Sequence, residues 1–492
     1  MSSLSSTFLL LILLSATVNV VTCNKRLEVV EIAREGLLQA MSWAKGYKIL
    51  NGPGRDSGFI NRALSDCVNL YKEAEPRLAR LVSDIEKDEF SYDDAVTWLS
   101  AASASHRTCL DGLGEKRVLF QAQQAQNLTR VIREALEVYG ADRDQRRKGK
   151  GKVVRKRPGL NNEEGSLSSW DASNSKADFV VAQDGSGNYK TINDAVAALA
   201  QLGQNRAQRV VVYVKSGVYN EKVEIGRDLK NIMFVGDGID KTVVTGNQNV
   251  QDGATTLNSA TFGVSGDGFW ARDITFENTA GPQKHQAVAL RVSSDLSVFY
   301  RCSFKGYQDT LLVHSLRQFY RECEVHGTID FIFGDAAVIF QQCDIYVRRP
   351  MDHQANMITA QGRDNPNENT GISILNSRVM PSYEFRDVKG NFKSYLGRPW
   401  KKYSRTVVFK TDLDGLIDGR GWKEWSGDFA LSTLYYAEYM NSGDGASTSN
   451  RVNWDGFHVL SDLNEANKFA VRNFIGGDDW IPATGVPFWI EL

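Results

Sequence analysis

The sequence predicts two folded parts in one chain: an α-helical bundle followed by a solenoid of short β-strands. Between residues 26 and 140, apolar residues recur at steps of three and four, the period of a helix that packs on one face. Further along, four short segments repeat the same order of residue types at spacings of 28, 21 and 20 residues, around Ile274, Cys302, Cys323 and Cys343. Such a period is typical of coils that stack on one another. A basic block separates the two patterns.

The first part of the chain, residues 1–23, is expected to be a secretory signal peptide. An apolar run extends from Phe8 to Val21, which is short for a membrane span but suits the core of a signal sequence. Cleavage is expected near Thr22 or Cys23. No Lys or Arg precedes Phe8, so a retained membrane anchor stays open as the alternative.

Residues 24–140 are expected to form an antiparallel four-helix bundle. The Asn-Gly-Pro-Gly segment at 51–54 separates the first two helices, and Ser91 is placed to cap the third. Cys67 and Cys109 fall on neighbouring helices, which a disulfide could join. Asn127 begins an Asn-Leu-Thr glycosylation signal, which applies only if the chain is exported.

Residues 141–176 are expected to be a linker. From Arg143 to Arg157, nine of fifteen residues are Lys or Arg, and so dense a run of like charge favours a disordered chain. The segment is either a processing site for a subtilisin-like protease, which needs an extended basic stretch, or a solvated spacer. Nucleic acid is not an expected partner, because the formal net charge is −1 and no aromatic residues lie among the basic ones.

Residues 177–492 are expected to form the solenoid. Short apolar or alternating runs, such as 209–214 and 406–409, are bounded by Gly, Asn and Asp and predict strands. A helix near 191–202 would close the open end of the core, as terminal units of a solenoid must. The far end of the solenoid is less regular, and three tryptophans suggest a tail packed on the barrel: Trp422, Trp425 and Trp480.

Three cysteines, Cys302, Cys323 and Cys343, lie about one period apart and should form a ladder. Stacked coils are separated by about 4.8 Å, which falls within the Cα range that a disulfide tolerates. We predict a bond between Cys302 and Cys323 with Cys343 left free. Three plain buried thiols are the alternative.

Asp309 and Asp330 are 21 residues apart and should therefore stack on neighbouring coils. Two carboxylates about 4.8 Å apart cannot both ionise freely, so the pKa of one rises and the pair can divide acid and base roles. Gln308 precedes Asp309, and Gln286 lies 22 residues before Gln308, so the same face should present two amides. Arg398 can bring a guanidinium to the same groove. Each residue alone is more often structural, but the set in this order favours catalysis.

Five segments of the solenoid region resemble the plant pectin methylesterases in the same order, and the match extends from about Phe179 to the C-terminus. The segments are Gly217–Glu221, Gln286–Arg291, Gln308–Leu311, Asp330–Gly334 and Leu396–Trp400. The helical region resembles the pectin methylesterase inhibitor family around Cys67 and in the stretch Trp98–Leu113. The resemblance implies a right-handed parallel β-helix that hydrolyses methyl esters of galacturonan without a cofactor, preceded by an inhibitor-like pro-region.

The resemblance also assigns roles by motif. Asp330 would attack the ester carbonyl as the nucleophile, and Asp309 would protonate the departing methanol and then activate water. Arg398 would orient Asp330 and lower its pKa, and Gln286 and Gln308 would donate to the oxyanion. Two aromatic residues are expected to contact the sugar: Trp400 and Phe331.

The chain departs from the family pattern at several positions. Asp335 stands where Asn is more common and would add negative charge near the site, and Leu312 replaces a frequent aromatic. The inhibitor-like region lacks the first cysteine pair of its family, and the linker lacks the usual Arg-Arg-Leu-Leu form. Two histidines, His314 and His326, have no further ligand at a suitable spacing, so no metal site is expected.

Two other functions remain as alternatives. A polygalacturonase on the same scaffold would also use paired carboxylates, and a non-catalytic wall-binding or inhibitory protein would use the bundle alone. The favoured interpretation is a secreted, monomeric esterase of the plant cell wall. Its expected partners are methylesterified homogalacturonan, pectin methylesterase inhibitor proteins and a processing protease.

Overall fold

The computed structural model describes residues 25–47, 55–115, 122–148, 167–203 and 209–492. The chain divides into two compact units, Met1–Lys152 and Val153–Leu492, and each is described by itself. The expected signal peptide, residues 1–23, and the helix break at 51–54 lie outside the described residues. Within the described ranges, no helix is both long and apolar enough to cross a membrane.

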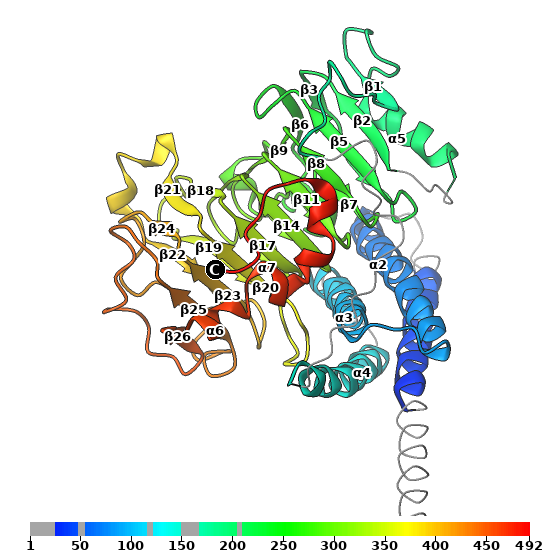
Figure 1. Cartoon of the computed structure of the whole chain (residues 1–492), viewed down its shortest axis with the longest axis horizontal. Helices are drawn as coiled ribbons and strands as arrows, with labels where there is room; N and C mark the ends of the chain where they lie inside the picture. Colours follow the sequence, from blue (N-terminus) through cyan, green and yellow to red (C-terminus); the bar gives the residue numbers. More distant parts are fainter. Residues whose placement is uncertain (1–24, 48–54, 116–121, 149–166, 204–208) are drawn as a thin grey trace, which may run out of the picture. The chain divides into compact units, whose positions relative to one another are not determined.

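The first unit is helical (Figure 1). Ser91 caps the third of its helices as predicted, since its Oγ accepts a hydrogen bond from the backbone N–H of Asp94 at 3.3 Å. A disulfide joins Cys67 to Cys109, which confirms the predicted staple between neighbouring helices. Asn127 is exposed, and its glycosylation stays a prediction. The four described helices are residues 25–47, α2 (Arg55–Glu86), α3 (Tyr92–Glu115) and α4 (Ala122–Lys148).

The last helix of this unit is longer than the sequence suggested. It continues to Lys148, eight residues beyond the expected end of the bundle at 140. Arg146 and Arg147 are therefore helical, and the prediction that they belong to an extended linker was wrong. The second basic cluster, Arg155 to Arg157, lies outside the described residues.

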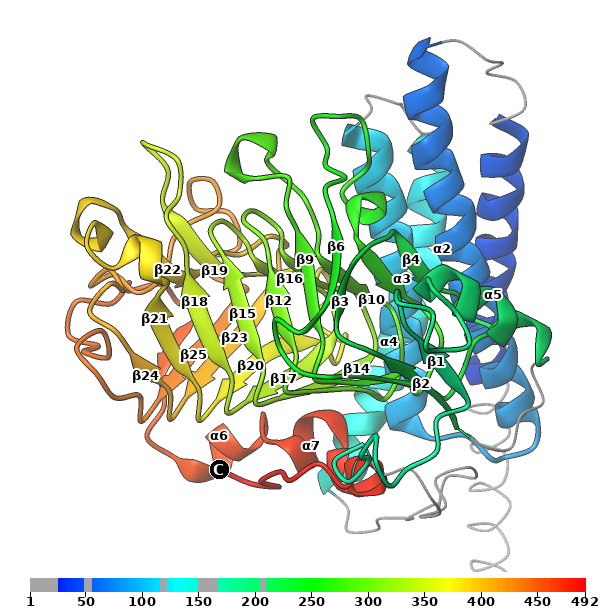
Figure 2. The same ribbon diagram turned by 90° about the horizontal axis from the view of Figure 1, so that it is seen from above.

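The second unit is a parallel β-helix of three sheets, which we name A, B and C (Figures 1 and 2). Sheet A contains β1 (Phe179–Val181), β2 (Val210–Val214), β5 (Ile232–Gly236), β8 (Trp270–Arg272), β11 (Ser297–Tyr300), β14 (Arg317–Arg321), β17 (Ala337–Gln341), β20 (Gly371–Leu375), β23 (Arg405–Phe409), β25 (Tyr435–Tyr439) and β26 (Phe457–Val459).

Sheets B and C complete each coil. Sheet B contains β3 (Gly217–Asn220), β6 (Thr242–Gly246), β9 (Thr275–Asn278), β12 (Ser303–Lys305), β15 (Glu324–Gly327), β18 (Asp344–Val347), β21 (Arg378–Pro381) and β24 (Asp412–Leu413). Sheet C contains β4 (Val223–Ile225), β7 (Phe262–Val264), β10 (Leu290–Val292), β13 (Leu311–Val313), β16 (Ile332–Gly334), β19 (Asn356–Gln361) and β22 (Ser394–Gly397).

The repeat found in the sequence is the register of sheet B. Phe276, Phe304, Val325 and Ile345 pair in one row across four consecutive strands. All four side chains are fully buried in the core that runs along the axis of the helix. The solenoid prediction is thus confirmed at the level of individual rungs, because residues one period apart lie side by side.

A left-handed residue turns the chain from sheet A into sheet B on each of these coils. Asp273, Arg301, Glu322 and Gln342 have φ values of 58°, 52°, 51° and 54°. One residue in this conformation bends the chain sharply, and the residue after it enters the core. The inward residues that follow are Ile274, Cys302, Cys323 and Cys343, all fully or almost fully buried.

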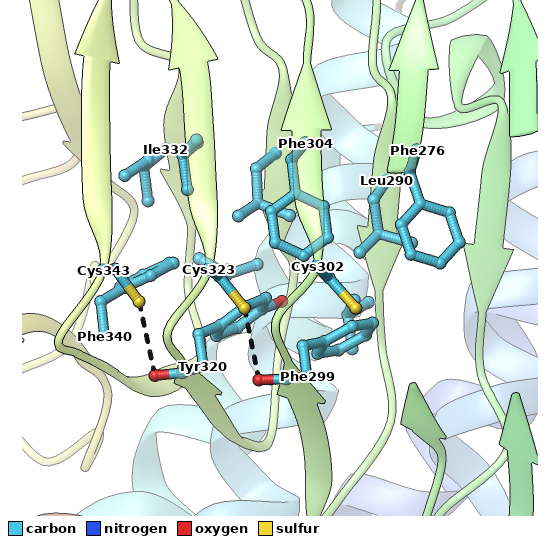
Figure 3. Close-up of a cluster of buried hydrophobic side chains, with 14 of the residues drawn as sticks. Phe276, Leu290, Phe299, Cys302, Phe304, Tyr320, Cys323, Ile332, Phe340 and Cys343 are labelled. Atoms are coloured by element: carbon cyan, nitrogen blue, oxygen red, sulfur yellow. Dashed lines mark hydrogen bonds between the residues drawn. The ribbon is translucent and has the colours of Figure 1, made fainter. Parts of the chain in front are cut away.

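The thiols of this column are free, so the predicted bond between Cys302 and Cys323 was wrong. Cys323 donates to the carbonyl of Phe299 at 3.4 Å, and Cys343 donates to the carbonyl of Tyr320 at 3.6 Å (Figure 3). Side chains in register on neighbouring strands run parallel, which keeps their Cβ atoms near the strand spacing of about 4.8 Å. A disulfide prefers about 3.8 Å.

Helices cover the start of the β-helix and the outer face of sheet A. At the start, α5 (Ile192–Gln201) begins at Thr191, whose side chain accepts from the N–H of Asp194, and it buries Ile192, Ala195 and Leu199 in the axial core. This confirms the predicted closing helix. After the last strand, α6 (Leu463–Asn467) and α7 (Val471–Ile475) lie over sheet A (Figure 2).

The last residues form a strap across sheet A. Trp480 is buried among the outward side chains of that sheet, as the predicted tail requires. The backbone N–H of Trp489 donates to Oε1 of Gln341 at 2.9 Å, and Nε2 of Gln341 donates back to the carbonyl of Trp489 at 3.0 Å. The strap is therefore tied to β17, well inside the sheet.

The β-helix unit begins earlier than the sequence suggested. Leu167 and Trp170, which fall in the predicted linker 141–176, are buried against sheet A. Arg272 donates to the carbonyl of Leu167 at 2.7 Å and to that of Trp170 at 2.8 Å. Residues 167–176 thus belong to this unit, and a catalytic fragment has to start before Leu167.

Candidate active site

Asp309 and Asp330 stand at the same level on neighbouring coils, as the period predicts. Leu311 pairs with Ile332 between β13 and β16, and each aspartate lies two residues before its paired residue. The N–H of Asp309 donates to the carbonyl of Ile329 at 3.0 Å, which ties the two turns together. Both aspartates are almost completely buried, at 7% and 5% exposure.

Both aspartates also have left-handed backbones. Their φ values are 64° for Asp309 and 51° for Asp330. Asp and Asn tolerate this region better than other residues with a side chain, yet it costs free energy wherever it occurs. Such backbones cluster at functional sites, where the surrounding structure holds a side chain in a required direction.

Arg398 reaches Asp330 from the last strand of sheet C. It follows β22 directly, and its N–H donates to the carbonyl of Thr359 on β19 at 3.0 Å. Its Nε donates to Oδ1 of Asp330 at 2.8 Å and its Nη2 to Oδ2 at 2.6 Å. This two-pronged contact fixes the plane of the carboxylate and identifies Arg398 as the partner of Asp330.

The electrostatics of Asp330 differ from the expectation. Burial raises its pKa, and the hydrogen bonds and charge of Arg398 lower it, with a net result above the ordinary value for aspartate. Arg398 therefore only offsets part of the cost of burying the carboxylate. Burial also lowers the pKa of Arg398 itself, but the carboxylate of Asp330 and the charge of Asp309 outweigh that effect. Both aspartates thus act on one guanidinium.

Gln286 and Gln308 border the same turns. Gln308 immediately precedes Asp309, and its carbonyl accepts from the N–H of Ala287 on the previous coil at 3.2 Å. The carbonyl of Gln286 accepts from the N–H of Val250 at 3.1 Å. Both side chains are half-buried. Within the described part of the chain neither side-chain amide has a hydrogen-bond partner, so both remain available as donors.

Trp400 and Phe331 have different surroundings. Trp400 is half-buried beside Phe333, with ring centroids 6.0 Å apart, and retains an accessible surface. Phe331 is fully buried in the axial core, so the expectation that it contacts substrate was wrong. The left-handed turn at Asp330 points the following residue inward. Phe333, two positions later, is the aromatic residue that reaches Trp400.

One residue at the site was not recognised from the sequence. The ring of Trp425 lies over the guanidinium of Arg398, with Cζ 4.3 Å from the ring centroid. The sequence assigned Trp425 to a packed tail, as it did the buried Trp422. The different surroundings of these two tryptophans could be predicted only if the bridge between Trp422 and Gly397 were known in advance.

Asp335 lies apart from the aspartate pair. It follows β16, at the end opposite to Asp330, and accepts hydrogen bonds from the amide of Gln361 at 3.1 Å and from the hydroxyl of Thr370. Its carboxylate is thus held by polar groups of its own. Leu312, where the family often has an aromatic residue, is 3% exposed and pairs with Phe333.

Comparison with known proteins identifies the family of the chain. Residues 178–478 match the family model described as Pectinesterase. The chain belongs to the pectinesterase family. As a pectinesterase it is a carboxylic ester hydrolase that demethylesterifies pectin. A second match, over residues 15–138, is to the plant invertase/pectin methylesterase inhibitor family.

Similar proteins cover nearly the whole chain. A probable pectinesterase/pectinesterase inhibitor of Arabidopsis thaliana is 56% identical over 94% of this chain and 93% of its own length. Pectinesterase 2 of Citrus sinensis is 53% identical over 80% of this chain and 75% of its own length. Together with the family matches, they confirm the predicted family.

Solved structures support the fold. The pectin methylesterase from carrot is 53% identical, with a TM-score of 0.64 over 65% of this chain and all of its own. A pectin methylesterase in complex with a hexasaccharide is 25% identical, with a TM-score of 0.51 over 61% of this chain and 98% of its own. The expected right-handed parallel β-helix after a helical bundle is confirmed.

Proposed function

We propose that this pectinesterase cleaves methyl esters of homogalacturonan through a covalent intermediate on Asp330. The ionised carboxylate, oriented by Arg398, attacks the ester carbonyl and forms a tetrahedral oxyanion. Side-chain amides of Gln286 and Gln308 donate to that oxyanion. The intermediate then collapses, the bond to the methoxy oxygen breaks, and Asp309 gives its proton to the departing oxygen, so that methanol leaves and an acyl anhydride with Asp330 remains.

The second half-reaction restores the enzyme. Asp309, now ionised, takes a proton from water, and the resulting hydroxide adds to the acyl carbon. The bond to Asp330 breaks, which releases the galacturonate carboxylic acid and returns Asp330 as a carboxylate. Asp309 is protonated again. Neither half-reaction consumes a further reagent, since methanol and the acid account for all atoms of ester and water.

The observation that carries this proposal is the two-pronged contact of Arg398 with a buried aspartate whose neighbouring coil supplies a second aspartate. A carboxylate with a fixed plane and no freedom to rotate is a prepared nucleophile. Trp400 offers an apolar face for a sugar ring. The complex of a similar pectin methylesterase with a hexasaccharide supports a carbohydrate chain as the ligand.

The test is methanol release from methylesterified pectin. A chain that starts at Pro158 retains Leu167 and Trp170, and we expect it to be active. Asp330→Asn should lower kcat by about 10³-fold or more, because the nucleophile is lost. Asn also tolerates the left-handed backbone at this position. Asp335→Asn is the matched control and should stay active. Equal rates for the Asp330→Asn and unmodified chains would refute the assignment.

We further propose that the chain acts outside the cell, in the wall, as a monomer released from its helical pro-region. Arg155 to Arg157 suits a subtilisin-like protease better than Arg146 and Arg147, because proteases need an extended segment and the first pair is helical. Replacing residues 155–157 by Ala should leave secreted protein uncut. Normal cutting in that variant would move the processing point elsewhere. The inhibitor-like match supports inhibitor proteins of the same family as partners.

A further inference from the structure

The segment that follows β24 (Asp412–Leu413) returns to sheet C beside β22, the strand that Arg398 directly follows. Trp422 forms a parallel bridge with Gly397, and the N–H of Lys423 donates to the carbonyl of Gly397 at 3.0 Å. This short stretch adds a rung to the edge of sheet C. Arg398 follows Gly397 directly, and Trp425 follows Lys423 by two residues. The rung therefore brings the segment that contains Trp425 alongside the strand that ends directly before Arg398.

Trp425 and Arg398 form a cation–π contact in which the guanidinium carbon lies over the indole ring. The guanidinium carbon lies 4.3 Å from the centroid of the indole. An aromatic ring attracts the flat face of a guanidinium and leaves the N–H groups on its edge free to donate. Those edge groups, Nε and Nη2, are the two that bind Asp330. The stack and the two-pronged contact are therefore compatible and restrict different motions of Arg398.

The burial of Trp425 argues against an ordinary core residue. It is 37% exposed, whereas Trp422, three residues earlier, is fully buried and donates through Nε1 to Glu438 at 3.1 Å. Among the described residues, the stack on Arg398 is the one ring, hydrogen-bond or ionic contact that Trp425 makes. Trp425 thus exposes a large indole, and its specific contact is with Arg398, the partner of the nucleophile. Its position is therefore explained by Arg398 rather than by core packing.

We propose that Trp425 is a positioning residue that holds the guanidinium of Arg398 in the plane required by Asp330. The inference rests on the proposed role of Asp330 as nucleophile. Arg398 has a side chain that is 24% exposed, so without the indole water reaches its face and the group can rotate about its last bonds. Asp330 would then lose its fixed plane while substrate still binds.

The experiment separates positioning from sugar binding by the type of side chain. Trp425→Phe keeps an aromatic face, and Trp425→Leu keeps apolar bulk without one. Phe429→Leu, at an exposed aromatic residue of the same loop (39%), is the matched control. All are made in the full chain and in the chain that starts at Pro158. We expect Trp425→Leu to lower kcat about tenfold with little change in KM, and Trp425→Phe to restore most of it.

A second measurement tests whether the effect passes through Arg398. In an Arg398→Lys background the stacked planar group is gone, so Trp425→Leu should cause little further loss in kcat. A raised KM with unchanged kcat, or a full loss that persists in the Arg398→Lys background, would overturn the inference. The proposed function is tested separately: an inactive Asp330→Asn with a normal Trp425→Leu refutes only this inference, and an active Asp330→Asn refutes the mechanism beneath it.

Discussion

At the scale of single residues, the buried carboxylate of Asp330 lowers the stability of the folded protein when it is ionised. Burial raises the pKa of Asp330 more than Arg398 lowers it, so the folded protein binds a proton here more readily than the unfolded chain does. By linkage, this group costs stability as pH rises from the ordinary aspartate pKa through the raised one. Asp330 therefore does not serve the fold, which agrees with a role in chemistry.

The same pKa predicts the acid limit of activity. Because a nucleophile must be ionised, kcat should fall on acidification around a pH above the ordinary value for aspartate. Arg398→Gln removes the group that lowers the pKa of Asp330, so this limit should move to higher pH, with a lower maximum rate. Profiles of methanol release against pH measure both effects. Lys402→Gln, at an exposed cation nearby, should leave the profile in place; an unshifted Arg398→Gln profile would contradict the argument.

The site was predictable where period and chemistry coincide. Asp309 and Asp330 are one coil apart, and spacing alone sets them at one level. Phe331 was misassigned because the left-handed backbone at Asp330 changes which of the following side chains point into the core. The residue types around Asp330 do not predict that conformation. Trp425 was missed because the path of its segment depends on the bridges of Ile417 with Ser394 and of Trp422 with Gly397, and local sequence does not encode such pairings.

At the scale of elements, the corner between sheets A and B explains the residues that suggested a disulfide. After the left-handed residues Arg301, Glu322 and Gln342 comes a cysteine that donates to a carbonyl, and the same column continues beyond Cys343. Ser377 donates to the carbonyl of Leu375 at 2.9 Å, and Thr411 donates to that of Phe409 at 3.0 Å. At this corner a thiol or a hydroxyl can therefore donate the same hydrogen bond to a nearby backbone carbonyl. Spacings of 34 residues hid the last two members from the sequence repeat.

This interpretation predicts how the chain responds to a reducing agent. The Cys67–Cys109 bond closes 42 residues, and its loss should destabilise the helical unit by about 4 kcal/mol by the chain-entropy relation. The β-helix should be unaffected, because its three cysteines are free thiols. Thermal unfolding with and without reductant, followed by helical circular dichroism and by activity, tests both statements. If reductant lowered the stability of the β-helix, that result would support a disulfide between Cys302 and Cys323.

At the scale of the whole molecule, the two units differ in how acid affects them. His106 is buried in the helical unit, where Nδ1 accepts from the hydroxyl of Tyr71 at 2.9 Å and Nε2 donates to the carbonyl of Ala125 at 3.1 Å. Burial lowers its pKa to about 4. The unfolded chain therefore binds a proton here that the folded one does not, between its ordinary pKa and about 4.

The helical unit should consequently lose stability as pH falls through that range, by on the order of 2–3 kcal/mol from His106 alone. His106→Gln keeps polar atoms in place and removes the titration, so its melting temperature should depend less on pH. Circular dichroism melts of the full chain between pH 7 and about 4 measure this difference. His458→Gln, in the β-helix, is the control. Parallel curves for the unmodified and His106→Gln chains would exclude His106 as the cause.

The division into bundle and β-helix was accessible from the sequence because each has its own period. The boundaries of the two units were harder to predict from the sequence. Charge density placed the linker at 141–176, but α4 continues to Lys148, and Leu167 and Trp170 pack on sheet A. A basic stretch can extend a helix that is already nucleated, and two apolar residues in a polar run gain burial only against a surface formed much later in the chain.

The anchoring of Trp489 to Gln341 affects how the protein is made. The outward side chains of β14 and β17 are covered by a segment that lies almost 150 residues later in the chain. While synthesis is under way, that apolar face of sheet A is uncovered, and a nascent chain stays exposed to aggregation until Phe488 and Trp489 have been translated. A chain truncated just before Phe488 should therefore give much less soluble enzyme than a chain that includes Phe488 and Trp489.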